Sequence, residues 1–239
     1  MRVNLFLLVL LLICVKVFPF QIRPANRESL TAATHAQSLA IHVETGSPEI
    51  SADAAAIQRY ELDSSRSRFV ARAFSGGLLW FKGHDHLIAV REFTGEVQIT
   101  MQSIMPASLQ IIAQAASMVE TRDVFTEPQK QIINKELREI VLLPTQYPDI
   151  VFKSTKISGK AIGSNQYNLK IAGNLTLHGV TRPLSIPTRV TLTGNELRAQ
   201  GEFSINRSDF KVKATSALHG MIRVRDKVKF EFDIVGHQR

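Results

Sequence analysis

The most constraining feature of this 239-residue sequence is a sustained alternation of apolar and polar residues between Arg59 and Ile234. Near the C-terminus, Phe230 and Phe232 are separated by Glu231, and the same parity continues to Ile234. A repeat of two places successive side chains on opposite faces of a strand, and it is typical of antiparallel sheets with one buried and one solvated face. The pattern therefore predicts a mainly all-β chain.

The alternation recurs in segments separated by turn signals such as SGG, GSN and TGN, so each segment reads as one strand. Consecutive strands that share one apolar face either close into a barrel or stack as a sandwich. We predict an extended antiparallel β-barrel of about eight strands, drawn from about ten segments. These segments are residues 59–63, 67–74, 78–90, 93–101, 107–114, 150–158, 167–177, 184–192, 196–205 and 228–234.

One segment departs from this pattern and predicts a helix. Thr126 is followed three residues later by Gln129, with Pro128 in the first turn, which is a capping-box arrangement. Apolar residues then recur at helical spacing until Pro144 ends the run. The sequence therefore predicts one inserted α-helix with an apolar face formed by Ile133, Leu137, Ile140 and Val141.

The N-terminal region is predicted to lie outside the barrel. Residues 5–15, LFLLVLLLICV, form an apolar run of the length of a secretory signal core, about 7 to 15 residues, whereas a membrane-spanning helix takes about 18 or more. We interpret residues 1–20 as a signal peptide rather than an uncleaved membrane anchor, residues 21–57 as a linker or disordered arm, and residues 58–237 as the barrel domain. The only cysteine, Cys14, would leave with the signal peptide, so we expect an exported protein without disulfides.

Composition and missing motifs narrow the function classes. The chain is 44% hydrophobic with a formal net charge of +8, a balance that suits a globular domain able to meet an anionic surface. The basic residues are scattered and no nucleic-acid motif accompanies them, so we expect no nucleic-acid partner. A phosphate-binding glycine loop, a serine elbow and paired metal-binding cysteines are also missing from the sequence. It therefore predicts a protein that is not an enzyme, with no cofactor and no metal ion, and it assigns no oligomeric state.

The tripeptide His84-Asp85-His86 lies within the apolar stretch WFKGHDHLIAV, residues 80–90. In a strand over 78–90, the two imidazoles share one face with their Cα atoms about 6.5 to 7 Å apart, and Asp85 points to the other face. Three roles are open to the pair. It can contact a ligand head group at the mouth of a cavity, hydrogen-bond locally at a bend of the strand, or bind a metal ion together with His178 or His219.

Four motifs, in this order along the chain, resemble those of the YceI-like family of polyisoprenoid-binding proteins. They are YELDSSRSRF at 60–69, YPDIVFKS at 147–154, LTLHGVTRPLSIP at 175–187 and NRSDF at 206–210. The resemblance extends from about residue 59 to residue 235. It implies a lipocalin-like barrel, export to the periplasm and an apolar interior that holds a long isoprenoid chain.

Two positions depart from the family pattern. Arg66 stands where the family often has a histidine, and Lys211 follows the NRSDF motif where the family usually has a glycine. These departures bear on the ligand head group rather than on the fold.

Together these features predict an exported carrier that holds a long-chain isoprenoid lipid or quinone and makes transient contact with a membrane surface. The competing hypothesis is a metal-binding protein or hydrolase built on His84, His86 and His178. A barrel filled by its own side chains, with no cavity, would leave only a structural or stress-related role. The residues predicted to bind the ligand are Trp80, Phe81, His84, His86, Phe93, Phe152, Phe203, Phe230 and Phe232.

Overall fold

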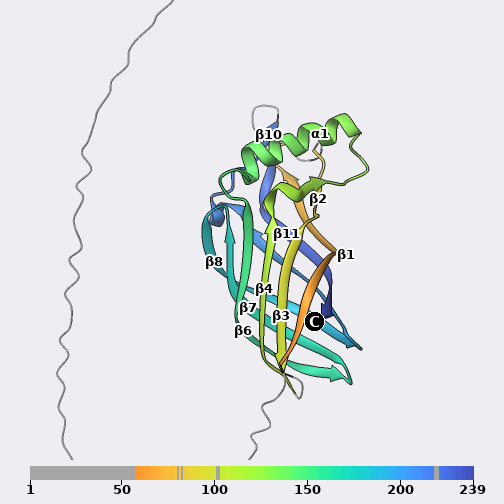
Figure 1. The fold of residues 1–239 in the computed structure, drawn as a ribbon. Coiled ribbons are helices and arrows are strands. Elements are labelled where there is room, and N and C mark those ends of the chain that lie inside the picture. The colour runs from red at the N-terminus through yellow and green to blue at the C-terminus, as the bar shows by residue number, and fades with distance from the viewer. Residues whose placement is uncertain (1–56, 80, 82, 101–102, 218–220) are drawn as a thin grey trace, which may run out of the picture. The chain divides into compact units, whose positions relative to one another are not determined.

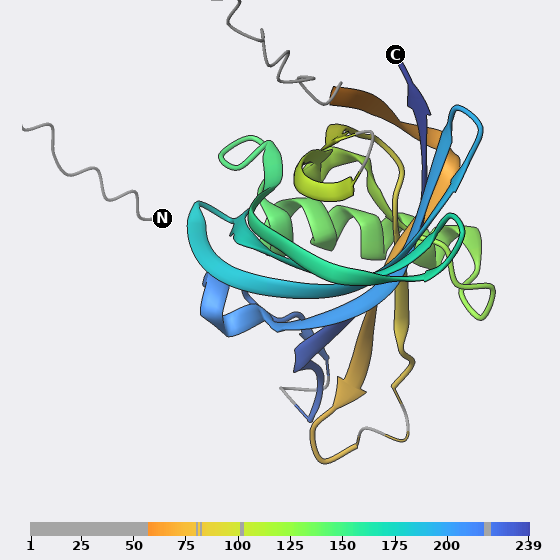
Figure 2. The same ribbon diagram turned by 90° about the horizontal axis from the view of Figure 1, so that it is seen from below.

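Eight antiparallel strands form a closed ring, because the first and the last long strands pair with each other. The ring runs through β1, β3, β4, β6, β7, β8, β9 and β11 and returns to β1, as the views from the side and along the barrel show (Figures 1 and 2). This confirms the predicted antiparallel barrel with one helix. The bounds are β1 (Ile57–Gly76), β3 (Phe93–Thr100), β4 (Ser103–Gln114), β6 (Asp149–Gly163), β7 (Gln166–Leu177), β8 (Val180–Thr193), β9 (Glu196–Asn206) and β11 (Ile222–Gln238).

The computed structural model describes residues 57–79, 81, 83–100, 103–217 and 221–239. The described residues do not include the predicted signal peptide (1–20) or the predicted arm (21–57), except for the last residue of the arm. Trp80 and His219 also lie outside them.

The two ends of the barrel are built differently. One end, the helix end, carries α1 (Glu127–Glu136), the π-helical turn η3 (Leu137–Leu142) and the short strands β2 (His86–Val90), β5 (Met118–Glu120) and β10 (Ser216–Ala217) (Figure 1). Two 3-10 turns lead to the short strands: η2 (Ala115–Ser117) lies between β4 and β5, and η4 (Arg207–Phe210) lies between β9 and β10. The opposite end holds the start of β1, the end of β11 and the tight β6–β7 and β8–β9 hairpins.

Two of the predicted strand boundaries are wrong. The segments predicted at 59–63 and 67–74 belong to one 20-residue strand, β1, whose pairing with β11 is irregular between Asp63 and Arg68. The segment predicted at 78–90 becomes a strand only at His86, because Gly77, with φ of 88°, turns the chain out of β1 into a loop. Asp85 holds the return of this loop, since its Oδ1 accepts a hydrogen bond from the backbone N–H of Ser75 at 3.0 Å.

The helix begins and ends where the sequence signals predict. At its start, Oε1 of Gln129 accepts a hydrogen bond from the backbone N–H of Thr126 at 2.8 Å, so the predicted capping box is present. The helical path continues through η3 and stops at Leu143, which has a left-handed φ of 49° just before Pro144. None of the helices in the described ranges has the length and hydropathy of a transmembrane span.

Alternate residues of each strand face the barrel interior and form one core. Two glycines let large rings lie against the sheet within this core. A Cβ atom at Gly173 would stand 2.6 Å from Cζ of Phe152, and one at Gly201 would stand 2.7 Å from Cζ of Phe232. The missing side chains therefore make room for phenylalanines inside the barrel.

Candidate functional site

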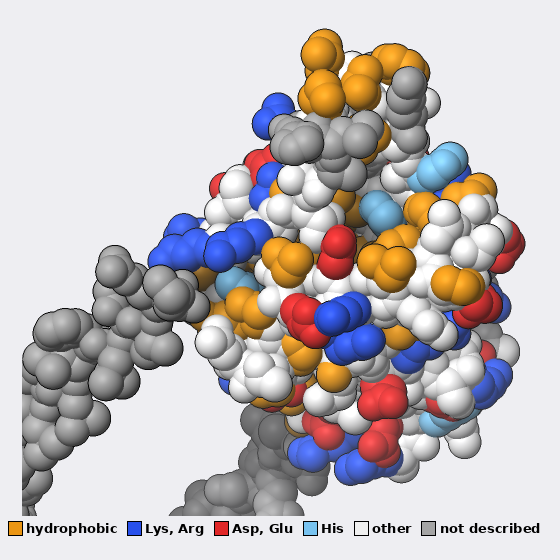
Figure 3. All heavy atoms as spheres, turned by 90° about the horizontal axis from the view of Figure 1, so that it is seen from above, with side chains coloured by type: hydrophobic (Ala, Val, Ile, Leu, Met, Phe, Trp, Pro, Cys, Tyr) orange, Lys and Arg blue, Asp and Glu red, His pale blue; other side chains and the backbone are white. Residues whose placement is uncertain are grey.

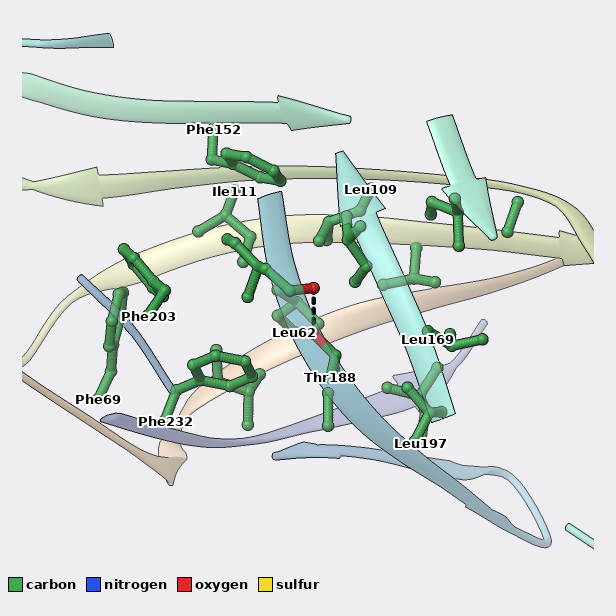
Figure 4. Close-up of a pocket in the computed structure, with 18 of the residues that line it drawn as sticks. Leu62, Phe69, Leu109, Ile111, Phe152, Leu169, Thr188, Leu197, Phe203 and Phe232 are labelled. Carbon is green, nitrogen blue, oxygen red and sulfur yellow. Dashed lines mark hydrogen bonds between the residues drawn. The ribbon is translucent and has the colours of Figure 1, made fainter. Parts of the chain in front are cut away.

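A cavity of about 120 Å³ lies inside the barrel; we call it the interior cavity (Figure 4). Its walls come from all eight strands of the ring, whose inward-facing residues are those of the strand alternation. Among the described residues, Thr188 is the only polar residue in its lining, and its hydroxyl group donates to the carbonyl oxygen of Ile186 at 3.4 Å. The lining thus offers apolar contact with no free hydrogen-bonding group. It includes Leu62, Leu109, Phe152, Leu175, Leu197 and Ile234.

An aromatic cluster lies at one end of the interior cavity. The rings of Phe203 and Phe230 stack with centroids 4.9 Å apart, and Phe69 contacts Phe230 at 6.1 Å, Phe232 at 6.4 Å and Phe93 at 6.2 Å. Figure 4 shows Phe69, Phe203 and Phe232 together on one side of the cavity. Edge and stacked contacts of this kind add stability beyond apolar burial, so the cluster closes this side of the cavity.

A second hollow, the helix-side pocket, lies at the helix end and has a volume of about 390 Å³. Along β1, the aromatic residue Phe69 lies between Leu62, which lines the interior cavity, and Ala73, which lines the helix-side pocket. Along β11, Phe230 likewise lies between Phe232 of the cavity and Val224 of the pocket. The aromatic cluster therefore separates the two hollows.

The helix-side pocket combines apolar and charged walls. Its apolar wall contains Phe125, the α1 residues Ile132 and Ile133, and Leu137 and Val141 from η3. Its basic wall contains Arg207 from η4, Lys213 from the loop after η4, and Arg223 from β11. A pocket of this composition can hold an apolar chain end beside an anionic or hydrogen-bond-accepting group.

Arg207 is fixed in this wall by its neighbours. Its guanidinium donates to the carbonyl oxygen of Val212 at 2.8 Å, and its Nε lies 3.9 Å from Oδ1 of Asp226. Within the described part of the chain, that buried Nε has no hydrogen-bond partner. The charge of Asp226 is itself engaged by the backbone N–H and hydroxyl group of Ser208, and these hydrogen bonds hold the pKa of Asp226 below its usual value.

The two predicted histidines line the helix-side pocket and meet on one aromatic ring. The imidazole of His86 stacks on Phe125 with centroids 5.4 Å apart, and the exposed His84 packs edge-on against the same ring at 5.7 Å. The pair was expected to share one face of a strand, but His84 precedes β2 and is not part of a strand. Phe125, which sequence reasoning did not single out, therefore brings the two rings together.

His86 also pairs with Glu120, a buried carboxylate at the end of β5. Nδ1 of His86 lies 2.8 Å from Oε2 of Glu120, whose other oxygen accepts backbone N–H groups from Leu87, Thr121 and Arg122. Burial alone would raise the pKa of Glu120, but the hydrogen bonds from His86, Arg122 and Leu87 outweigh it, so its pKa lies below the ordinary value. Glu120 is thus an ionised structural anchor under the pocket.

His178 occupies a different environment from the other two histidines. It has a left-handed φ of 52° in the turn before Gly179, and its ring lies 4.2 Å from the ring of Tyr147. Burial, and then the nearby charge of Lys213, lower the pKa of His178, which therefore favours the neutral imidazole. In the described ranges, no group of three or more His, Cys, Asp or Glu side chains is arranged to hold a metal ion.

The structure distributes the predicted ligand-binding residues over several places. Phe152, Phe203 and Phe232 line the interior cavity, and His84 and His86 line the helix-side pocket. Phe93 and Phe230 belong to the aromatic cluster and line neither hollow. Phe81 lies exposed outside both hollows, and Trp80 is not among the described residues.

Sequence reasoning missed Phe69 and the basic wall. Phe69 could have been found, because its parity in the predicted strand 67–74 is that of an inward residue. Lys213 and Arg223 carry no such signal, since they reach the pocket from a loop and from the start of a strand.

Known proteins share this architecture. BcnA of Burkholderia cenocepacia matches with a TM-score of 0.55 and 21% identity, over 73% of this chain and 98% of that chain. A polyisoprenoid binding domain from Saccharophagus degradans matches with a TM-score of 0.53 and 13% identity, over 75% of this chain and 98% of that chain. At these identities the likeness establishes a common fold.

Sequence comparisons lead to the same group of proteins. The UPF0312 protein VPA0850 of Vibrio parahaemolyticus is 27% identical over 104 residues, which are 44% of this chain and 49% of the relative, so the chain spans about half the length of the curated relative it matches. The model of the YceI-like domain matches residues 60–236, which include most of β1 and β11 and all the ring strands between them. The resemblance seen in the four motifs is confirmed, and the chain belongs to the YceI-like family.

Proposed function

We propose that this protein is an exported, non-enzymatic carrier that holds the long apolar tail of an isoprenoid lipid or quinone inside its barrel. The observation that carries the proposal is the lining of the interior cavity, in which Thr188 is the only polar residue among those described and has its hydroxyl group bonded internally. Such a lining favours hydrocarbon and gives nothing for a polar or charged substrate to bind. The printed description of the Saccharophagus degradans neighbour, a polyisoprenoid binding domain, supports the same ligand class.

Burial of the tail supplies the binding energy in this proposal. Each methylene group removed from water contributes about 0.8 kcal/mol, so a tail of a few isoprene units binds tightly without polar contacts. The volume of about 120 Å³ is smaller than that of most ligand pockets, about 300 to 1,000 Å³. A longer chain therefore enters only as rings of the aromatic cluster, such as Phe230, move aside.

The head group of the ligand is assigned to the helix-side pocket. Lys213 and Arg223 supply positive charge there, and His84 supplies a hydrogen-bonding imidazole. These groups suit a phosphate or a quinone oxygen, both of which accept hydrogen bonds from cationic donors. In this arrangement the tail passes the aromatic cluster and the head remains at the helix end, where a transient contact with a membrane allows the ligand to exchange.

The proposal is tested by native mass spectrometry of the protein purified without organic solvent. We expect retained mass that solvent extraction releases as an isoprenoid lipid or quinone, and we expect the extracted protein to bind a fluorescent fatty-acid probe that added isoprenoid alcohol displaces. Loss of probe binding in the presence of zinc or nickel, with bound metal instead of lipid, would favour the competing histidine-based hypothesis. Protein that retains no lipid and binds no probe would contradict the carrier function.

A further inference from the structure

The exposed large hydrophobic residues are concentrated at the helix end. In the described part of the chain, Leu78, Phe81, Val124, Ile132, Ile140 and Met221 belong to this end, whereas only Ile57 and Ile162 lie at the opposite end. Figure 3, which looks onto the helix end, shows hydrophobic side chains gathered at one margin with Lys and Arg side chains nearby. Large exposed apolar groups that cluster in this way mark an interaction surface.

Three of these residues form a protrusion that we call the apolar tip: Leu78, Phe81 and Met221, with exposed fractions of 78%, 64% and 40%. Two segments distant in sequence bring them together, since the backbone N–H of Leu79 donates to the carbonyl oxygen of Met221 at 2.9 Å. Below the tip, Gly76 of β1 pairs with Arg223 of β11. The tip is therefore anchored on the seam where the barrel closes.

Basic residues surround the base of the apolar tip. Lys213 and Arg223 are exposed, and within the described ranges neither lies within ion-pair distance of a carboxylate. Arg225 is also exposed, and its guanidinium donates to the carbonyl oxygen of Ser75 at 2.7 Å, at the end of β1. The nearest acid along β11, Asp226, is engaged by Ser208. The surroundings of the tip thus carry an excess of positive charge.

We propose that the apolar tip inserts into the surface of an anionic phospholipid bilayer, with Lys213 and Arg223 against the lipid phosphates. An apolar and aromatic protrusion with a cationic base matches the layered chemistry of a membrane interface, in which acyl chains lie beneath anionic head groups. This inference deepens the membrane contact proposed above and names the surface that makes it. The helix-side pocket, which shares Arg223 and Lys213 with this surface, then opens toward the bilayer.

The chain contains its own reporter for this contact. Trp80 is the single tryptophan and is bonded in sequence to Leu79 and Phe81, so its emission reports on the segment that carries the tip. The full-length protein is mixed with vesicles of brominated phosphatidylglycerol or brominated phosphatidylcholine, whose acyl chains quench only a fluorophore that reaches them. We expect strong quenching by the anionic vesicles, weak quenching by the zwitterionic vesicles, and loss of most quenching in 1 M salt, where the screening length is about 3 Å.

Two matched double variants decide which end of the barrel is responsible. Leu78→Asp with Met221→Asp removes two apolar groups from the tip, and Ile57→Asp with Ile162→Asp makes the same change at the opposite end. We expect the first variant to require at least about tenfold more anionic lipid for half-maximal quenching. The second should match the unmodified protein, and circular dichroism of both should retain the β-sheet spectrum.

Several outcomes would overturn the inference. These are no quenching of the unmodified protein, equal quenching by both kinds of vesicle, undiminished quenching of the tip variant, or a tip that instead forms dimers of the protein in the absence of lipid. Probe binding in the barrel is measured on the same samples, because Leu78 and Met221 line neither hollow. Loss of quenching with intact probe binding rejects only the docking surface, whereas intact quenching without probe binding rejects only the carrier function.

Discussion

The interior cavity and the helix-side pocket lie in one barrel and differ in almost every chemical respect. The cavity is lined by strand residues and has Thr188 as the only polar residue described in its wall, whereas the pocket has Lys213, Arg223 and Glu136 beside its apolar residues. A purely apolar wall gives affinity that grows with the length of a hydrocarbon and does not distinguish one polar head from another. Charged donors give that distinction. In the carrier that we propose, the cavity supplies affinity and the pocket supplies selectivity.

The two hollows also respond differently to their surroundings. The interior cavity has no titratable group in its described lining, so pH and salt leave it unchanged. The helix-side pocket rests on the hydrogen bond between His86 and the carboxylate of Glu120, and α1 is tied to the same site because Asn134 accepts a hydrogen bond from the backbone N–H of Glu120 at 2.8 Å. Changes in pH or charge should therefore act on one end of the barrel only.

The largest expected effect comes from filling the interior cavity. Ala199 lines the cavity from β9, and Ala199→Trp places an indole ring where we propose that the ligand tail binds. Displacing about four methylene groups costs about 3 kcal/mol, so we expect the Kd for an isoprenoid alcohol to rise on the order of 100-fold. Fluorescence competition with a fatty-acid probe measures this change.

The matched control for this variant is Ala172→Trp, since Ala172 of β7 pairs with the exposed Lys156 and adds the same ring on the outer face of the barrel. Its affinity should equal that of the unmodified protein. Equal affinities for both tryptophan variants, with intact circular dichroism spectra, would show that the tail binds elsewhere.

A smaller effect is expected from the anchor beneath the helix-side pocket. Glu120→Gln removes a buried charge that accepts several hydrogen bonds, so we expect the free energy of unfolding at pH 7 to fall by about 2 kcal/mol. Since the folded-state pKa of Glu120 is lower than its unfolded value of about 4.3, its contribution is present above that pH and is lost as the pH falls through the folded-state pKa. As the pH is lowered, the free energy of unfolding of Glu120→Gln should therefore fall less than that of the unmodified protein.

Urea unfolding between pH 3 and pH 7 follows this loss. Glu127→Gln changes an exposed carboxylate at the start of α1 and serves as the control, for which we expect the pH dependence of the unmodified protein. If Glu120→Gln retains the full acid dependence, the carboxylate of Glu120 is not the anchor that its contacts indicate.

The smallest expected effect separates head-group recognition from tail binding. In the triple variant His84→Ala, Lys213→Gln and Arg223→Gln, the pocket loses its imidazole donor and two positive charges. We expect about tenfold weaker binding of an isoprenoid phosphate, which corresponds to about 1.4 kcal/mol, and unchanged binding of an isoprenoid hydrocarbon. Isothermal titration calorimetry with the two ligands measures the difference.

Lys156→Gln with Lys160→Gln neutralises two exposed lysines on the outer face of β6 and controls for the change in net charge. A loss of affinity of the same size for the phosphate and the hydrocarbon would place the head group outside the helix-side pocket. His86 is left unchanged in the test, because its pairing with Glu120 would mix a loss of stability with a loss of binding.

The contrast between the two hollows also explains what could be predicted from the sequence. The interior cavity follows from strand parity, so inward residues such as Phe152 and Phe232 could be named from the alternation alone. The capping box at Thr126 likewise located the helix, since its hydrogen bonds join residues only three positions apart. Local periodicity and local hydrogen bonding are visible in a sequence.

The helix-side pocket joins segments that no local pattern connects. His86 and Glu120 pair through the packing of β2 on β5, and Lys213 enters from a loop after η4. The strand predicted over 78–90 was wrong in its first half for a related reason: the apolar residues there belong to an exposed tip, with Leu78 at 78% exposure, and only the second half, β2, has a buried face. Lys211 adopts a left-handed φ of 57°, a backbone conformation that glycine accepts without strain, which gives a physical reason for the glycine that the family usually has there.

The seam between β1 and β11 has a consequence for how the chain acquires its structure. Its register runs from Tyr60 opposite Gln238 to Gly76 opposite Arg223, so the barrel cannot close until its last 17-residue strand has been synthesised. Pairing residues so far apart in sequence makes closure a late and slow step of folding. In a protein exported as we propose, this delay keeps the polypeptide open during synthesis and leaves ring closure to the compartment where the lipid is collected.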